Sequence, residues 1–269
     1  MTTPQALRPL PLLLACALAP ACFEEPVTAA EARTAVDDVV ATGQAVSVQD
    51  GIVEITTSFT LADGLRDAAQ QVRAFVESQI SCSTVSSPAE NTLVIDFGTL
   101  DDECSFEGRT FAGVVTLEFE PGEEQVVITH AYDGLTDGKA ALDGSATVTW
   151  TERARHIVTD LAFSNARGQF TATSDRTQTR IGARGEGLTV EGVRDWQGPR
   201  GDWHLDIDDV ELRAVDPVPQ DGAYAVTLPN GKQITMSFER IDADTIEVRI
   251  AGGRRDRIFR VSSAGDVDG

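Results

Sequence analysis

CSTVSSPAENTLVIDFGTLDDECSFEGRTFAGVVTLEF, residues 82–119, is the stretch that decides the fold. Apolar residues alternate with polar ones over 93–97 and again over 115–119, which is typical of half-buried strands. Gly98 ends the first strand, and an acidic loop leads from it to Cys104. The stretch therefore predicts two strands, each apolar on one face and polar on the other.

Cys82 and Cys104 frame this loop. A bond between them would tie the end of a preceding helix to the loop between two strands. In the chain-entropy model, closing a loop of about 23 residues destabilises the unfolded state by roughly 3.5 kcal/mol. In an oxidising compartment this pairing is favoured over the alternative of two free thiols. We therefore predict a disulfide between Cys82 and Cys104.

The first 21 residues predict a targeting leader and not a part of the fold. Arg8 is their one charge, and 9–21 is an apolar run too short to span a bilayer. The small residues Ala-Pro-Ala then precede Cys22, a pattern that resembles a bacterial lipobox. We predict a lipoprotein signal peptide over 1–21, a lipid such as palmitate on Cys22, and a tether over 22–27.

Alternatives remain open at this terminus. Cys16 follows Leu-Leu-Ala, a closer lipobox match in residue type, but it leaves a very short apolar run, so Cys22 is favoured. Ordinary cleavage after Ala21 would leave an unpaired thiol, an unusual outcome for a secreted chain. Phe23 follows Cys22 where an inner-membrane lipoprotein would carry Asp, which by resemblance to sorted lipoproteins favours the outer membrane. We expect a cell-envelope protein, lipid-anchored to the outer membrane on its periplasmic or surface side.

The chain is strongly acidic. Its 43 Asp and Glu against 22 Lys and Arg give a formal net charge of −21 over 269 residues. A net field of this sign disfavours both nucleic acid and anionic lipid as partners of the chain as a whole. The expected partners are the membrane, through the N-terminal lipid, and a protein, glycan or lipid that the sequence does not name.

Residues 28–81 predict a helical N-terminal region. The segment 28–31 (TAAE) has the spacing of a capping box, apolar residues follow at helical spacing, and Gly43 predicts the helix end. The β-branched run 52–60 favours a strand, although it would also extend a helix. A second helix is predicted over 62–80.

Residues 82–261 predict an antiparallel β domain, followed by a disordered tail over 262–269. The one clear break is VDPVP at 215–219, and Asn230-Gly231 is a strong hairpin signal. Besides the strands of the opening stretch, the predicted strands are 125–132, 140–150, 155–164, 168–174, 176–181, 187–196, 202–213, 224–228, 232–239, 245–250 and 257–261.

About a dozen sequential strands with short turns make a meander. A meander of this length curls or closes, because a flat open sheet leaves its edges exposed. The predicted fold class is mainly β: a long antiparallel meander forming a curled sheet, half barrel or barrel. We expect the two N-terminal helices to lie against its concave face or to cap one end.

Residues that carry chemistry are scattered. His130, His156 and His204 each lie inside a predicted strand, and we interpret them as exposed or edge histidines and not as metal ligands. No G-x-S-x-G elbow, phosphate loop or HExxH motif occurs. We predict no catalytic residue, no metal site and no cofactor. The three tryptophans are interpreted as core or sheet packing in preference to the lining of a ligand groove: Trp150, Trp196 and Trp203.

Several motifs resemble those of uncharacterised secreted lipoproteins common in the Bacteroidota. That family carries Cys-Pro-Thr-Val, a strand ending in Asp-Phe-Gly, a second cysteine, then Asp-Gly-Arg-Thr and a strand that starts with glycine. The matching residues here are CSTV at 82–85, LVIDFG at 93–98, Cys104, EGRT at 107–110 and GVV at 113–115. The resemblance covers most of 60–261 and implies fold and location, because the family has no assigned activity. The family often has a second cysteine pair near the C-terminus; this chain lacks it, so one disulfide is expected.

These observations lead to three hypotheses for function. The first is a non-enzymatic envelope or surface binding module. The alternative is a carrier that holds a hydrophobic ligand in the concave face of the sheet. A weaker alternative is a carbohydrate-active enzyme, which needs a cleft with two carboxyls at hydrolase spacing, one of them with a raised pKa.

Overall fold

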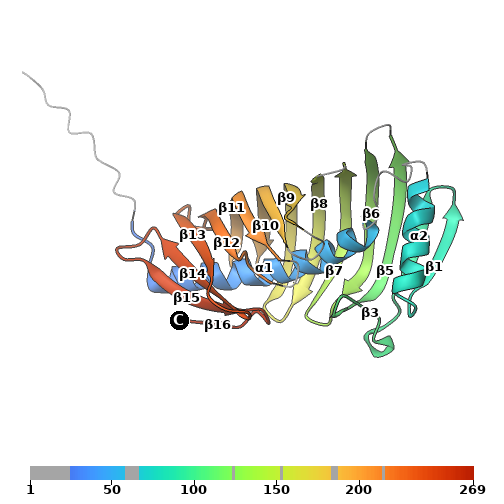
Figure 1. The fold of residues 1–269 in the computed structure, drawn as a ribbon. Coiled ribbons are helices and arrows are strands. Elements are labelled where there is room, and N and C mark those ends of the chain that lie inside the picture. Colours follow the sequence, from blue (N-terminus) through green and yellow to red (C-terminus); the bar gives the residue numbers. More distant parts are fainter. Residues whose placement is uncertain (1–24, 58–66, 123–124, 152–153, 183–186, 214–215) are drawn as a thin grey trace, which may run out of the picture.

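The computed structural model describes residues 25–57, 67–122, 125–151, 154–182, 187–213 and 216–269 (Figure 1). Two α-helices come first, α1 (Ala29–Thr56) and α2 (Ala68–Gln79), and a single 3-10 turn, η3 (Leu100–Asp102), follows later. The strands are β1 (Thr84–Ala89), β2 (Thr92–Asp96), β3 (Ser105–Phe106), β4 (Arg109–Thr110), β5 (Ala112–Pro121), β6 (Val126–Thr136), β7 (Ala140–Trp150), β8 (Ala154–Asn165), β9 (Gly168–Arg180), β10 (Leu188–Gly198), β11 (Gly201–Leu212), β12 (Asp221–Thr227), β13 (Gln233–Arg240), β14 (Thr245–Ala251), β15 (Arg257–Ser262) and β16 (Val267–Asp268).

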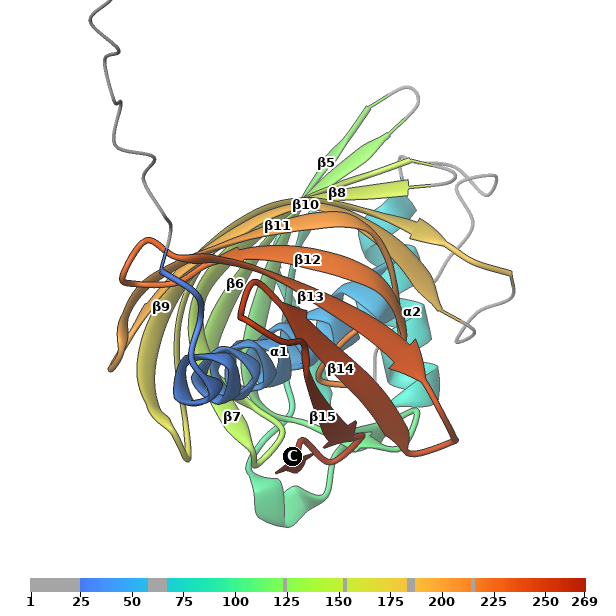
Figure 2. The ribbon, with the colours of Figure 1, turned by 90° about the vertical axis from the view of Figure 1, so that its left-hand side faces the viewer.

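Within the described ranges, fourteen strands form one antiparallel sheet, in which each strand pairs with the next strand of that sheet along the chain. The order runs from β1 and β2 to β5 and then without interruption to β16, while β3 and β4 pair as a small separate hairpin. The sheet curls around α1 and is not closed into a barrel (Figure 2). The prediction of a mainly β, curled meander is therefore confirmed.

Individual strands show where the sequence pattern misled. The segments 168–174 and 176–181 were predicted as two strands, but they form the one strand β9, because Asp175 continues the in–out alternation without a turn. Strand β1 was not predicted, since its residues TVSSPA lack apolar alternation. It is an edge strand with mostly exposed side chains, so the alternation that marks a half-buried strand is not needed there.

Helix α1 lies along the concave face of the sheet. It begins at the predicted capping box, where Thr28 accepts from the Glu31 amide and the Glu31 carboxylate accepts from the Thr28 amide. More than half of its residues are buried, and they point to all sides of the helix. The strand favoured over 52–60 is wrong for residues 52–56, which are the last turns of α1. Burial on every side outweighs the β preference of these branched residues, because a helix enclosed by a sheet needs apolar residues all round.

Gly43 does not end the helix, contrary to expectation. A Cβ atom at this position would lie 2.0 Å from the backbone oxygen of Pro217. The segment 216–219 therefore crosses close over α1, and its Val218 is buried in the same core as the helix. Within the break that the sequence shows, the described residues 216–219 contact the helix, and the sheet continues beyond them through the pairing of β11 with β12.

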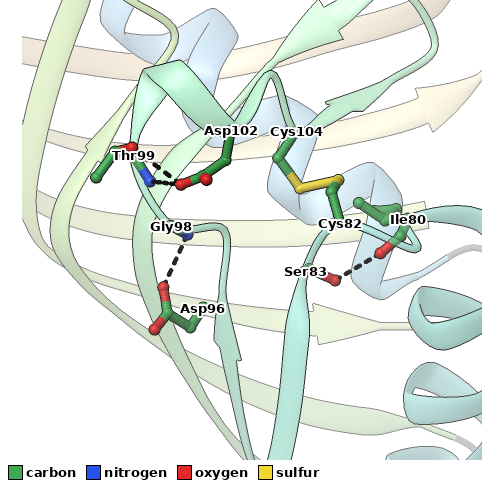
Figure 3. The surroundings of a disulfide bond; sticks show 8 residues. All are labelled: Ile80, Cys82, Ser83, Asp96, Gly98, Thr99, Asp102 and Cys104. Atoms are coloured by element: carbon green, nitrogen blue, oxygen red, sulfur yellow. Dashed lines mark hydrogen bonds between the residues drawn. A yellow bond between two sulfur atoms is a disulfide. The ribbon is translucent and has the colours of Figure 1, made fainter.

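Helix α2 lies at the β1 end of the sheet, where it packs against β1, β2 and β5. It was predicted over 62–80; residues 62–66 lie outside the described residues. Just beyond its end, Cys82 is bonded to Cys104, with 5.4 Å between their Cα atoms (Figure 3). The predicted disulfide is present, and Cys104 is fully buried.

The loop that carries Cys104 is held by local hydrogen bonds (Figure 3). The Asp96 carboxylate accepts from the Gly98 amide at 2.8 Å, and the Asp102 carboxylate accepts from the Thr99 amide at 2.7 Å. The acidic residues of this loop therefore act as local caps and hold the turn in which the disulfide is formed.

The C-terminal segment differs from the expected disordered tail over 262–269. Residues 267 and 268 form the short strand β16, paired with β15. The Arg33 side chain of α1 donates to the carbonyl oxygen of Val267 at 2.7 Å. This contact ties the tail to the start of the helix. No helix in the described ranges is both long enough and apolar enough to cross a membrane.

Candidate functional site

A polar cluster is buried between α1 and the inner face of the sheet. Arg176 of β9 donates to both carboxylate oxygens of Asp50 on α1, at 2.7 and 3.1 Å, and to the side-chain oxygen of Gln49 at 2.6 Å. Gln178, two residues along β9, donates to the same carboxylate at 3.1 Å. Arg176 is 1% exposed and Asp50 is 3% exposed, so this ion pair is removed from water.

Further polar groups surround this pair. Burial raises the pKa of the Tyr132 hydroxyl on β6 and raises that of Tyr224 on β12 to about 12. Burial also lowers the pKa of Arg194 on β10, whose Nε atom has no hydrogen-bond partner among the described residues. Buried ion pairs seldom add net stability, because desolvation offsets their attraction. We interpret the cluster as a device that fixes the position of α1 under the sheet.

A cavity of about 20 Å³ adjoins this cluster. Its lining includes Val39 and Asp50 of α1 together with Arg194 and Tyr224 of the sheet. A space of this size is large enough for one water molecule and too small for an organic ligand. It is therefore not a site for a hydrophobic cargo.

His130 is part of this interior, and its interpretation as an exposed or edge histidine is wrong. It is fully buried on β6, and its Nε2 atom lies 2.9 Å from the hydroxyl of Thr56, the last residue of α1. Burial lowers the pKa of His130 to about 4. The ring is therefore neutral at pH 7 and holds the end of the helix against the sheet.

The outer face of the sheet has a different character. Outward-pointing residues of β6 to β13 form two continuous cross-strand rows, which we call the outer-face rows. They consist mainly of short polar side chains and carry four aspartates. One row is Ala131, Ser145, Asp160, Thr173, Asp195, His204, Thr227 and Gln233; the other is Thr129, Thr147, Val158, Asp175, Val193, Asp206, Ala225 and Thr235.

Two histidines lie among these aspartates. Both side chains are at exposed strand positions, as the sequence predicted. His156 is the outward-pointing residue of β8 next to Val158 of the rows. Its ring nitrogen lies 2.6 Å from the Asp175 carboxylate. His204 contacts Asp195 at 2.7 Å and Asp206 at 3.3 Å. The hydrogen bond with Asp195 is the main cause of a raised pKa at His204. The three aspartates remain more than half exposed, so their charges are available at the surface.

An open hollow of about 730 Å³ lies toward one end of the same outer face. Its lining mixes polar and apolar residues, with Phe163 and Phe170 at its base, and comes from β7, β8, β9 and the β10–β11 hairpin. The lining includes Ala141, Asp143, Ala162, Ser164, Gln169, Thr171, Gln197 and Pro199. The hollow offers hydroxyl, amide and carboxylate groups to a contacting surface.

The tryptophans lie in the core, as expected. Trp196 and Trp203 stack with their ring centroids 5.5 Å apart, and each is 3% exposed. Trp150 is 6% exposed. None of the three offers an aromatic platform to a ligand on the outer face.

Two observations bear on metal binding and acid–base chemistry in the described residues. No three His, Cys, Asp or Glu side chains there are placed to hold a metal ion. Among the carboxyl groups with a clear shift, Asp38 alone has a raised pKa, and burial is the cause. Asp38 is 1% exposed on α1 and accepts a hydrogen bond from Arg200 at 2.5 Å, so it lies beneath the surface and is already paired.

The site residues predicted from sequence have two outcomes. Cys82 and Cys104 are brought together as predicted, whereas Cys22, and its alternative Cys16, lie outside the described residues. The buried cluster was missed, although a signal existed: Arg176, Gln178 and Arg194 occupy inward positions of their strands. No protein-family model, curated protein or solved structure matches this chain.

Proposed function

We propose that this chain is a non-enzymatic binding protein of the cell envelope, anchored to the outer membrane by a lipid on Cys22. Its partner binds to the outer face of the sheet. The observation that supports this most directly is the contrast between the two faces. The inner face is occupied by α1, whereas the outer-face rows cross eight strands and are largely exposed.

The charge of the outer face favours a positively charged protein surface as the partner. Asp160, Asp175, Asp195 and Asp206 all belong to the outer-face rows, and the rows contain no Lys or Arg. Electrostatic complementarity of this kind steers encounter and selects partners. We therefore expect binding that weakens steeply as salt is raised.

The two alternative functions have less support. A carrier needs a free concave face, and here a ligand would have to displace α1 together with the Asp50–Arg176 ion pair. A glycosidase needs a second carboxyl near one of raised pKa. Asp38 is buried and bonded to Arg200, which does not fit that role.

Metabolic labelling tests the anchor. The full chain is expressed with a radioactive fatty acid in a bacterium that processes lipoproteins, alongside the variants Cys22→Ala and Cys16→Ala. The proposal expects label in the wild type and in Cys16→Ala, and none in Cys22→Ala. Label that persists in Cys22→Ala, or its absence from the wild type, would overturn the anchor.

Site-specific photo-crosslinking in the native envelope tests the outer face. A photoreactive residue in place of Thr173, inside the outer-face rows, should give a defined protein adduct. The same residue in place of Ala89, exposed on the edge strand β1, is the matched control and should not give it. Crosslinking from the control alone would overturn the proposed face.

Two charge variants then test the partner chemistry. Changing the four row aspartates to Asn should abolish the Thr173 adduct. An equal charge change at exposed positions outside the rows should leave it intact: Glu90→Gln, Asp101→Asn, Glu120→Gln and Asp268→Asn. Equal loss in both variants, or a partner whose contacting surface is not basic, would refute charge complementarity at this face.

A further inference from the structure

One end of this acidic molecule is basic. Five of the chain's 22 Lys and Arg fall within residues 249–260, and all five are exposed on β14, β15 and the turn between them. We call this segment the arginine hairpin: Arg249, Arg254, Arg255, Arg257 and Arg260. Such a cluster in a chain of net charge −21 is a local reversal of the field.

Four of these arginines have no ion-pair partner among the described residues: Arg254, Arg255, Arg257 and Arg260. Arg249, in contrast, contacts Glu247 at 3.4 Å and Asp256 at 3.8 Å. Glu247 and Asp268 are the ladder neighbours of Arg260 on either side, but neither forms an ion pair with it in the described residues. The tip of the turn keeps guanidinium groups that are free to bind an anion.

An apolar side chain accompanies them. Ile258 is 46% exposed, one of few large apolar side chains so exposed in the described ranges. It pairs in the ladder with Arg249 and lies two residues before Arg260, so these three side chains share one face of the hairpin. Arg257 pairs with Ile250 and lies on the other face. Arginines around an exposed apolar residue are typical of surfaces that rest in the headgroup region of a membrane.

The hairpin lies where the chain enters the fold. Val27 pairs with Gly253, and its amide donates to the carbonyl oxygen of Gly252 at 3.2 Å. Gly253 directly precedes Arg254. Helix α1 begins at the same end of the molecule as β14 and β15 (Figure 1). Val27 is five positions after Cys22 in the sequence, a reach of at most about 18 Å.

From this placement we propose that the arginine hairpin binds the phosphate-bearing headgroups of the membrane that holds the anchor. The proposal rests on the anchor at Cys22. A basic patch beside a lipid anchor adds electrostatic attraction to anionic headgroups. With this contact, the end of the molecule formed by β13–β16 would face the bilayer. The outer face of the sheet would then point away to the side, parallel to the membrane plane.

Vesicle flotation tests the hairpin without the lipid. The protein used starts at residue 22, as after leader cleavage, and carries Cys22→Ala so that no lipid can be attached. It is mixed with vesicles of phosphatidylglycerol and phosphatidylcholine, or with vesicles of phosphatidylcholine alone. We expect binding to the anionic vesicles that is lost at high salt. Since each arginine near the surface contributes roughly fivefold in affinity, Arg254→Gln, Arg255→Gln and Arg257→Gln together should weaken it by more than about tenfold.

A matched control removes three positive charges away from the hairpin: Arg73→Gln, Lys139→Gln and Arg180→Gln. Lys139 and Arg180 are exposed, and the side chain of Arg73 is 43% exposed. This variant should bind as the wild type does. Equal affinity for both vesicle types, or equal loss in the control, would overturn the proposal. Because this chain carries no lipid, the result is independent of the labelling result for Cys22, and the two failures are distinguishable.

Discussion

Charged side chains on the inner face of the sheet are buried, whereas those on the outer face are exposed to solvent. On β9, Asp175 points outward with its side chain 61% exposed, whereas the next residue, Arg176, points inward and is 1% exposed. The outward charge is screened by solvent and remains available to a partner. The inward charge is stable only because Asp50 of α1 neutralises it. Adjacent residues of one strand therefore serve different faces: Asp175 belongs to the exposed outer face, and Arg176 holds α1 against the inner face.

The largest expected effect comes from breaking the inner pair. Asp50→Asn should lower the free energy of unfolding by about 4 kcal/mol, because it leaves Arg176 buried without a counter-charge. Urea unfolding measures this as a lower midpoint at constant m value. The matched change on the outer face, Asp160→Asn, should shift stability by less than about 0.5 kcal/mol.

A second pair of variants sharpens this point. Replacing both partners by apolar residues, Asp50→Leu with Arg176→Met, should recover much of the loss, since no charge then remains buried alone. If the double variant is as unstable as Asp50→Asn, the cluster contributes through packing and not through charge compensation.

The disulfide gives the next largest effect, at the β1 end of the sheet, where α2 packs against the strands. Replacing Cys82 and Cys104 by Ala should lower the free energy of unfolding by roughly 3.5 kcal/mol. Reductant should destabilise the wild type similarly and leave the variant unchanged. A wild type insensitive to reductant under unfolding conditions would contradict this assignment.

His130 makes the inner face sensitive to acid. Its folded pKa of about 4 lies below the ordinary value of 6.5, so between these values the unfolded state binds more protons. Stability should therefore fall as pH drops from about 6.5 toward 4, by about 3 kcal/mol from this group. In His130→Gln, unfolding followed across this range should lack that part of the pH dependence; parallel curves would refute the assignment.

The smallest effect, of opposite sign, belongs to His204 on the outer face. Its pKa is raised by Asp195, so its ion pairs stabilise the fold fully below the unfolded pKa, and this contribution is lost as pH rises through the folded pKa. Because the side chain is 41% exposed, solvent screening keeps the effect below about 1 kcal/mol. In His204→Gln, the free energy of unfolding should not show this small decrease as pH rises. In the wild type, high salt should screen the ion pairs and make the decrease smaller.

The sequence by itself determined much of this protein. Alternation of apolar residues is a local property of each strand, so the meander, most strand positions and the outward side of His156 and His204 were readable. The capping box at Thr28 and the pairing of Cys82 with Cys104 are likewise local or compositional signals.

Only the tertiary structure decided what fills the curl of the sheet. Ile52 and Val53 favour a strand by local preference, yet they end a helix because the concave sheet buries them from all sides. The neutralisation of Arg176 by Asp50 joins residues 126 positions apart, and no local pattern encodes such a pairing. The same holds for Val27 beside Gly253, which brings the N-terminal segment to the arginine hairpin.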